Sequence, residues 1–406
     1  MTIRLAGDWA PRTIQVMPLA WDGLAIINLE GPILDNPTDD EKSPKAGPCL
    51  WHATLPRGIE KAAYVLANNH IMDYGGRGLT QTIDIIKSSN AYHCGAAANL
   101  DASRKPLILN HDGVCVGIIS RCETQFGIAE RDRPGASPID STINQDIKEL
   151  KSNCDLLIVS LHAAAEMSPW PSPSRQDLCR ALIDAGADIV HGHHSHVPQG
   201  WEKYGDGYIF YGLGNLCVDP SSWSENPNCL WSLTPQVFHS ENNLSVDIKT
   251  TEIKSNQSGL LQVIDSLDES KEAQNRYLQI CNQPLGDRRL LEGLWQEIAV
   301  DLYQSHFGPW LGLNQAQAHD PKGLFSSLKL KASKVKNLIR KSGAKRNPIQ
   351  LTPPSRYTQM LWYHLFACES HSSAISTALG VLSGSIGDLR SEQTAQLVSE
   401  MMNGPH

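Results

Sequence analysis

Residues 187–200 read ADIVHGHHSHVPQG, a segment that joins an apolar β-strand to four histidines within six positions. The histidines follow the point at which we expect the strand to end: His191, His193, His194 and His196. His194 and His196 are two positions apart, so on an extended or turning segment both imidazoles can face one point. Neutral imidazole is a common ligand of zinc, iron, nickel and copper. The segment therefore predicts a metal site, with a histidine-rich surface loop as the alternative.

Apolar runs alternate with helical patterns over residues 1–250. We expect strands at 3–8, 24–32, 62–70, 114–120, 155–162 and 208–215, and the segment 187–196 begins as a further strand; helices are expected at 78–90 and 175–188. This alternation is typical of a layered α/β fold. Open sheets of that class place their ligands at the carboxyl ends of the strands.

Metal-capable side chains recur at these strand ends. Besides the histidine cluster, they are Asp8, Glu30, Asn69, His70 and His162. Each has an alternative interpretation: a turn or helix cap for Asp8, an exposed loop carboxylate for Glu30, and a buried hydrogen-bonded histidine for His162. The Asn-Asn-His run could likewise form an Asx turn. Together, mixed oxygen and nitrogen ligands favour a two-metal site that clamps a phosphate and activates water.

Three residues near these ligands are candidates for catalysis. His70 could donate a proton to a leaving group. Asp73 could orient His70 or cap the helix near residue 78, and Glu166 follows His162 closely enough to lie beside the site. The sequence has no P-loop, GxSxG elbow or GxGxxG fingerprint, which argues against ATPase, serine hydrolase and dinucleotide-binding functions.

Composition limits the class of protein. The 406 residues carry a net charge of −8, which argues against a nucleic-acid binder. No apolar stretch is long enough to span a bilayer, and the first residues lack the apolar core of a signal peptide, so we expect a cytoplasmic protein. The 10 cysteines show no CxxC pair, and we expect buried free thiols.

Residues 251–406 form a second region with helical patterns, after a first domain at residues 1–250. We expect helices at 266–283, 288–307, 325–346, 357–371 and 391–402. The segment 322–346 is basic and suits peripheral contact with an anionic membrane or polymer, or a solvated helix face.

The motifs of residues 3–218 occur in a recognisable order: AGDW, INLEGP, ANNHIMDYGGRGL, SLHAAAE, LIDAGADIVHGHHSHVPQG and IFYGLGN. This ordered set resembles the CapA-type poly-γ-glutamate capsule biosynthesis family, which is itself similar to the calcineurin-like metallophosphoesterases. The resemblance implies a metallophosphoesterase-like α/β sandwich, followed here by a helical C-terminal region.

The resemblance also implies roles for single residues. It makes Asp8 a ligand of the first metal, Glu30 the bridging carboxylate, Asn69 a ligand of the second metal and His70 the proton donor. The remaining metal ligands are His162, His194 and His196, with His193 as the substitute if the register differs by one residue. Phosphoesterases have Asp-x-His where this chain has Asp8-Trp9-Ala10, and they bridge the metals with aspartate instead of glutamate.

These implications lead to a functional hypothesis. We expect two divalent ions (manganese, zinc or iron) in a hydrolase of the phosphoesterase type, associated with capsule or surface-polymer synthesis. Its substrate would be an anionic polymer or a phosphoester, and its partners would be capsule-synthesis proteins. The alternative is a non-catalytic module that binds an anionic polymer or assembles a synthase, with a structural or vestigial metal site.

Overall fold

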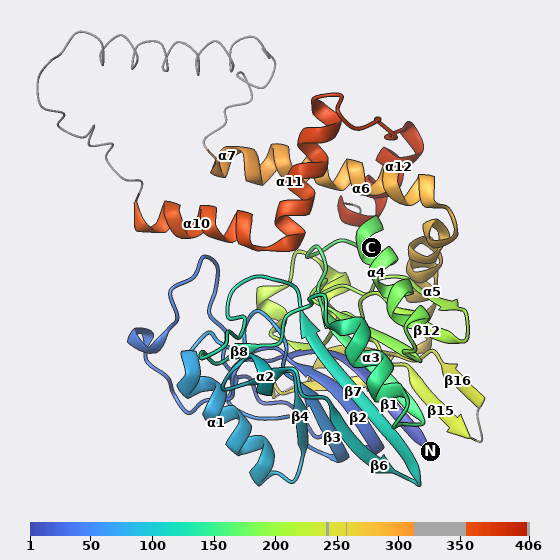
Figure 1. The fold of residues 1–406 in the computed structure, drawn as a ribbon. Coiled ribbons are helices and arrows are strands. Elements are labelled where there is room, and N and C mark those ends of the chain that lie inside the picture. The colour runs from blue at the N-terminus through green and yellow to red at the C-terminus, as the bar shows by residue number, and fades with distance from the viewer. Residues whose placement is uncertain (241–242, 257, 312–354, 404–406) are drawn as a thin grey trace, which may run out of the picture.

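The fold is a sandwich of two β-sheets with helices on its outer faces and at one end (Figure 1). It is seen in a computed structural model that describes residues 1–240, 243–256, 258–311 and 355–403. The predicted α/β sandwich with a helical C-terminal region is confirmed. The predicted helix at 325–346 and the basic segment 322–346 lie outside the described residues.

The larger sheet has the order β16-β15-β1-β2-β3-β4, with β13 pairing with β1. Strands β1 to β4 and β13 run parallel. The bounds are β1 Thr2–Ala10, β2 Trp21–Leu29, β3 Ile59–Val65, β4 Tyr92–Cys94, β13 Asn215–Val218, β15 Gln236–Ser240 and β16 Asn243–Asp247.

The second sheet has the order β11-β12-β10-β9-β7-β6, and its strands β7, β9, β10 and β12 are parallel. The bounds are β6 Leu107–His111, β7 Val114–Cys122, β9 Leu156–His162, β10 Ile189–His193, β11 Trp201–Tyr204 and β12 Gly207–Phe210. Two small sheets complete the strands: β14 Trp231–Leu233 with β17 Thr250–Ser255 and β18 Leu261–Asp265, and β5 Ala96–Ala97 with β8 Gly135–Ala136.

The main core lies between the two sheets. Alternate residues of a strand point to opposite faces, so Leu5 and Ile26 of the larger sheet meet Ile118 and Ile158 of the second. The outer face of the larger sheet packs against α1 (Gly75–Ser88). Helices α3 (Ile143–Lys151) and α4 (Pro173–Asp184) cover the outer face of the second sheet, and a short α2 (Leu100–Ser103) lies beside β5.

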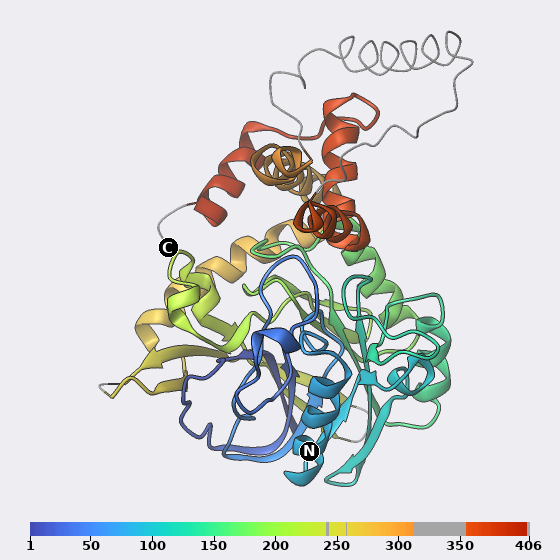
Figure 2. The ribbon, with the colours of Figure 1, turned by 90° about the vertical axis from the view of Figure 1, so that its left-hand side faces the viewer.

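The C-terminal helices gather at one end of the sandwich (Figures 1 and 2). They are α5 Asp268–Asn282, α6 Arg288–Leu302, α7 Gly308–Trp310, α10 Arg356–Ala367, α11 Glu369–Leu382 and α12 Glu392–Asn403, with a π-helical turn at Tyr303–Phe307. The Glu369 amide donates to the Thr124 carbonyl just after β7, so α11 sits over the carboxyl ends of the parallel strands. Among the residues that the structure describes, no helix has the length and apolar character to cross a membrane.

Several predicted bounds are wrong, for identifiable reasons. The strand predicted at 208–215 ends at Phe210, because the chain then leaves the second sheet and enters the larger sheet as β13 at Asn215. The helix predicted at 357–371 is broken at Cys368, whose ψ of 123° turns α11 toward β7. Strand β17 begins at Thr250 and β18 follows at Leu261–Asp265, so the region after residue 250 starts with strands before its helices. The domain boundary at 250 stays a prediction.

Candidate metal centre

Two buried carboxylates lie at the ends of adjacent strands of the larger sheet. Asp8 lies near the end of β1, beside a shift in the pairing with β2, and Glu30 directly follows β2. Both are fully buried. The Asn28 side chain donates to Asp8 Oδ1 over 2.8 Å and lies 3.2 Å from Nδ1 of His162 on the opposite sheet. Asn28 thus ties the two halves of the site together.

The loop after β3 carries the Asn-Asn-His run. Asn68 donates to the Leu29 carbonyl over 2.8 Å and accepts from the His70 amide over 3.1 Å, which is the Asx turn left open by the sequence. Asn69 is not used in that turn: its Oδ1 lies 3.0 Å from His162 Nε2. The turn therefore fixes the backbone, while Asn69 faces the site.

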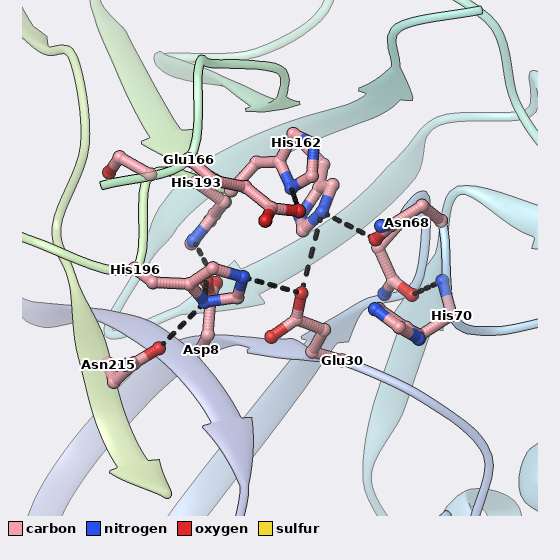
Figure 3. Close-up of polar contacts among 12 residues, drawn as sticks. Asp8, Glu30, Asn68, His70, His162, Glu166, His193, His196 and Asn215 are labelled. Carbon is pink, nitrogen blue, oxygen red and sulfur yellow. Dashed lines mark hydrogen bonds and ion pairs between the residues drawn. The ribbon is translucent and has the colours of Figure 1, made fainter. Parts of the chain in front are cut away.

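The histidine cluster leaves β10 through strained backbone. His194 and His196 have φ values of 84° and 58°, which non-glycine residues rarely adopt and which often mark functional sites. His196 lies between the two carboxylates: its Nδ1 is 3.5 Å from Asp8 Oδ2 and its Nε2 is 3.7 Å from Glu30 Oε1 (Figure 3). Asn215 contacts the same Nδ1 at 3.1 Å.

His193, the substitute ligand, also lies in the site. Its Nδ1 is 3.1 Å from Asp8 Oδ1, and its side chain is fully buried. The Asp-x-His position is filled differently: Trp9 is buried and Ala10 offers no ligand. His193 therefore places an imidazole beside Asp8, although the chain has no histidine two residues after Asp8.

Glu30 is the feature that best fits a bound cation. Neither of its carboxylate oxygens has a hydrogen-bond partner among the described residues, although the side chain is fully buried. Its Oε1 lies 3.7 Å from Nε2 of both His162 and His196. Glu30, His194 and His196 each offer a ligand atom within 4.8 Å of the others. A fully buried carboxylate that accepts no hydrogen bonds is costly to keep ionised, so this donor set fits a divalent ion.

The pKa shifts of the site residues reflect their burial and the charges that lie close to them. Burial raises the pKa of Glu30 well above its usual range. Burial also lowers the pKa of His162 well below its usual range and that of His194 to about 3, so both imidazoles are neutral and ready to bind a metal. For His196, burial acts against protonation, but the carboxylates of Glu30 and Asp8 outweigh it and raise the pKa to about 9.

His70 is held by a buried triad of side chains. Its Nδ1 is 2.7 Å from Asp73 Oδ2 and 3.0 Å from Lys45 Nζ, and Lys45 also forms an ion pair with Asp73. The Leu50 amide donates to the same Asp73 oxygen over 2.6 Å. Asp73 therefore contacts His70 directly, as predicted for an orienting residue. Lys45 was not predicted, because it lies in a polar loop without a recognisable motif.

Replacing Lys45 by methionine should lower the free energy of unfolding by on the order of 3 kcal/mol, because buried Asp73 would lose its cationic partner. Urea denaturation followed by tryptophan fluorescence measures this change. Lys42→Met is the control, since it removes only an exposed ion pair with Asp39. Equal unfolding midpoints for the two variants would contradict the structural role of Lys45.

Two glutamates approach His194 from opposite sides. Glu166 lies in the loop after β9, with Oε1 3.9 Å from His194 Nδ1, and half of its side chain is exposed. Glu123, directly after β7, has Oε1 3.6 Å from His194 Nε2 and is fully buried. Burial raises the pKa of Glu123 to about 7. Glu123 was not predicted, although it too is an acid that directly follows an apolar strand.

Two cavities flank the centre. One, of about 520 Å³, includes Glu166 and His194 and is closed by residues of the C-terminal helices, among them His371. The other, of about 340 Å³, includes Lys45 and Asn69. Each cavity therefore borders a residue of the cluster, His194 in the first and Asn69 in the second.

Curated relatives of this chain include proteins named for capsule and PGA biosynthesis. The chain is 32% identical over 206 residues to the capsule biosynthesis protein CapA of Bacillus anthracis, covering 47% of this chain and 49% of that protein. It is 36% identical over 157 residues to the PGA biosynthesis protein CapA of Bacillus subtilis, covering 38% and 41%. The chain thus spans about half the length of these curated relatives, or less.

Among solved structures, the chain is similar to a 5'-nucleotidase from Candida albicans, with a TM-score of 0.30 and 12% identity over 50% of this chain and 38% of that one. The sequence profile described as "Bacterial capsule synthesis protein PGA_cap" matches residues 15–220. This match covers half of the chain and includes every predicted site residue except Asp8. The chain therefore belongs to the bacterial capsule synthesis protein PGA_cap family.

Proposed function

We propose that this protein is a metal-dependent hydrolase of the phosphoesterase type that acts in capsule or surface-polymer synthesis. The observation that carries the proposal is the buried Glu30 carboxylate, which has no hydrogen-bond partner in the described part of the chain and faces the imidazoles of His162 and His196. Such an arrangement is costly in a purely structural core. It becomes favourable when divalent cations occupy the space between these side chains.

The residues divide into two overlapping ligand sets. Asp8, His196 and Glu30 would hold one cation, with His193 beside Asp8. Glu30, Asn69, His162 and His194 would hold the other. Cations bound here would supply Lewis acidity that activates water and polarises a phosphoryl group. Manganese, zinc and iron all suit a mixture of carboxylate, amide and imidazole ligands.

His70 would protonate the leaving group. Asp73 and Lys45 surround its Nδ1, which fixes the ring and leaves Nε2 as the atom for proton transfer. A purely structural metal site needs no such proton donor. Glu166, half exposed at the mouth of the larger cavity, would contact the substrate or the attacking water.

Replacing His70 by alanine should leave the metal content unchanged and lower the hydrolysis rate by about 100-fold or more, as expected for loss of a general acid. Elemental analysis and steady-state kinetics on the same preparation measure both quantities. A variant that hydrolyses its substrate at the parental rate would exclude His70 as proton donor.

Family membership and the two Bacillus relatives support the capsule setting. We accordingly propose an anionic polymer, such as poly-γ-glutamate, or a phosphoester intermediate as substrate. Other capsule-synthesis proteins would be its partners.

A second candidate is a non-catalytic module that binds an anionic polymer or assembles a synthase. Ala10 favours it, because the Asp-x-His ligand of phosphoesterases is missing there. In that case the cluster binds metal for structure alone.

The test of hydrolysis uses the full chain loaded with Mn²⁺ or Zn²⁺ and screened against phosphomonoesters, phosphodiesters and poly-γ-glutamate. The proposal expects metal-dependent turnover that His70→Ala reduces. Polymer binding with no turnover of any of these substrates would replace the hydrolase by the binding module.

A further inference from the structure

Glu123 joins the C-terminal helices to the strand ends. It directly follows β7, and its amide donates to the His162 carbonyl over 3.1 Å. Its carboxylate is fully buried and receives hydrogen bonds from the start of α11: Ser370 Oγ donates to Oε2 over 2.6 Å, and Cys368 Sγ contacts Oε1 at 3.4 Å. Arg175 of α4 forms an ion pair with Oε2 at 3.2 Å. Both carboxylate oxygens are therefore held in place.

The held carboxylate faces one edge of His194. Glu123 Oε1 lies 3.6 Å from His194 Nε2, and a shift of about half an ångström would bring the pair into hydrogen-bond range. The other nitrogen, Nδ1, is buried and has no hydrogen-bond partner among the described residues. His194 is also one of the two histidines whose ligand atoms converge with a carboxylate oxygen of Glu30. The ring thus has a carboxylate near Nε2, and its Nδ1 is the nitrogen available to bind a metal.

We propose that Glu123 is a positioning residue for His194, and that through it helix α11 sets the geometry of the metal centre. The inference rests on the proposed metal site and extends it to residues outside the family match, which ends at residue 220. A carboxylate on the outer nitrogen of a ligating histidine fixes its tautomer and ring orientation and increases its basicity. The left-handed φ of 84° at His194 makes such support important, because that backbone is intrinsically strained.

A simpler role for Glu123 would be to anchor α11 through a buried ion pair. That role predicts a loss of stability but no change in the metal site. The two roles are separated by measuring metal affinity on folded protein, apart from any hydrolysis.

The experiment measures Mn²⁺ affinity by isothermal titration calorimetry and Co²⁺ coordination by visible absorption on the full chain. The variants are Glu123→Ala, Glu123→Gln and Ser370→Ala, each checked by circular dichroism. The matched control is Glu202→Gln, because Glu202 forms a comparable ion pair with Arg180 on the same helix, α4, but contacts no residue of the centre.

We expect Glu123→Ala to bind Mn²⁺ about 10- to 100-fold more weakly, the usual cost of a lost outer-shell partner. Glu123→Gln should recover part of that affinity, because its amide oxygen can still accept from Nε2. Ser370→Ala should change affinity in the same direction and by less. The Co²⁺ spectrum should change in Glu123→Ala and not in Glu202→Gln.

The inference would be overturned, with the metal site left intact, if folded Glu123→Ala kept the parental Mn²⁺ affinity and Co²⁺ spectrum. If Glu123→Ala does not fold, the same result in both Glu123→Gln and Ser370→Ala would overturn it. Failure of the parental protein to bind Mn²⁺ or Co²⁺ would instead overturn the metal site itself, and the inference with it.

Discussion

Replacing Glu30 by glutamine should abolish tight metal binding and make the metal-free protein more stable. Both effects follow from one fact: the carboxylate is fully buried, and neither oxygen has a hydrogen-bond partner within the ranges that the structure describes. Glutamine keeps the shape but carries no charge, so the cost of burying the carboxylate disappears. We expect a gain in unfolding free energy of roughly 1 kcal/mol or more in the absence of metal.

The affinity for Mn²⁺ should fall further than the roughly 10- to 100-fold that a lost outer-shell contact costs. Calorimetric titration and urea denaturation in chelator measure the two effects. Glu202→Gln is again the control: it loses a partnered charge, so stability should fall while metal binding stays as in the parent. Should metal-free Glu30→Gln prove less stable than the parent, burial of the Glu30 carboxylate would not carry the net cost that we infer.

Replacing Gly192 by alanine should disrupt the second sheet around the histidine cluster. Gly192 lies in β10, where it separates His191 from His193. An added Cβ would lie 2.6 Å from the Phe210 carbonyl oxygen and closer still to the backbone of Tyr211. Backbone atoms of the neighbouring segment cannot move aside as a flexible side chain would. We expect a loss of about 3 kcal/mol or more in unfolding free energy.

The measurement is the urea midpoint of the purified variant, or its soluble yield if it fails to fold. Gly286→Ala provides the control, because the Cβ that it would add meets no described residue within 4 Å apart from its own chain neighbours. If Gly192→Ala unfolds at the same urea concentration as Gly286→Ala, the close approach of β10 to residues 210–211 does not contribute to stability.

The strand ends could be predicted from sequence because their signal is local. A short apolar run that ends in Asp8, Glu30 or His162 predicts both a strand and the candidate site residue at its end. Parallel pairing aligns the strand ends within each sheet, and the packing of the two sheets brings Asp8 and Glu30 near His162. The same logic explains why Asn69 and His70 were found as candidates although β3 ends earlier than predicted, at Val65.

The rest of the site depends on contacts between distant segments. Lys45 reaches His70 from a loop 25 residues earlier, and Ser370 reaches Glu123 across 247 positions. Neither pair has a fixed spacing that a sequence pattern could reveal. Asn28 carried a clue, a polar side chain inside an apolar strand, and its contacts with Asp8 and His162 explain it.

Secondary structure was missed where the hydrophobic pattern is weak. The hairpin of β15 and β16 reads QVFHS and NLSVD, with exposed or half-buried residues at most positions. The break between α10 and α11 has no glycine or proline to mark it. It arises where Cys368 and Ser370 contact Glu123, a tertiary interaction that overrides a continuous helical pattern.

The central claim is that the strand-end cluster binds divalent metal, and elemental analysis tests it most directly. Protein purified without chelator and dialysed with Mn²⁺ or Zn²⁺ should carry about one to two equivalents per chain, as a two-metal centre requires. The His196→Ala variant, which removes the imidazole between Asp8 and Glu30, should lose most of that metal. Equal metal in the two proteins, or none in either, would contradict the account.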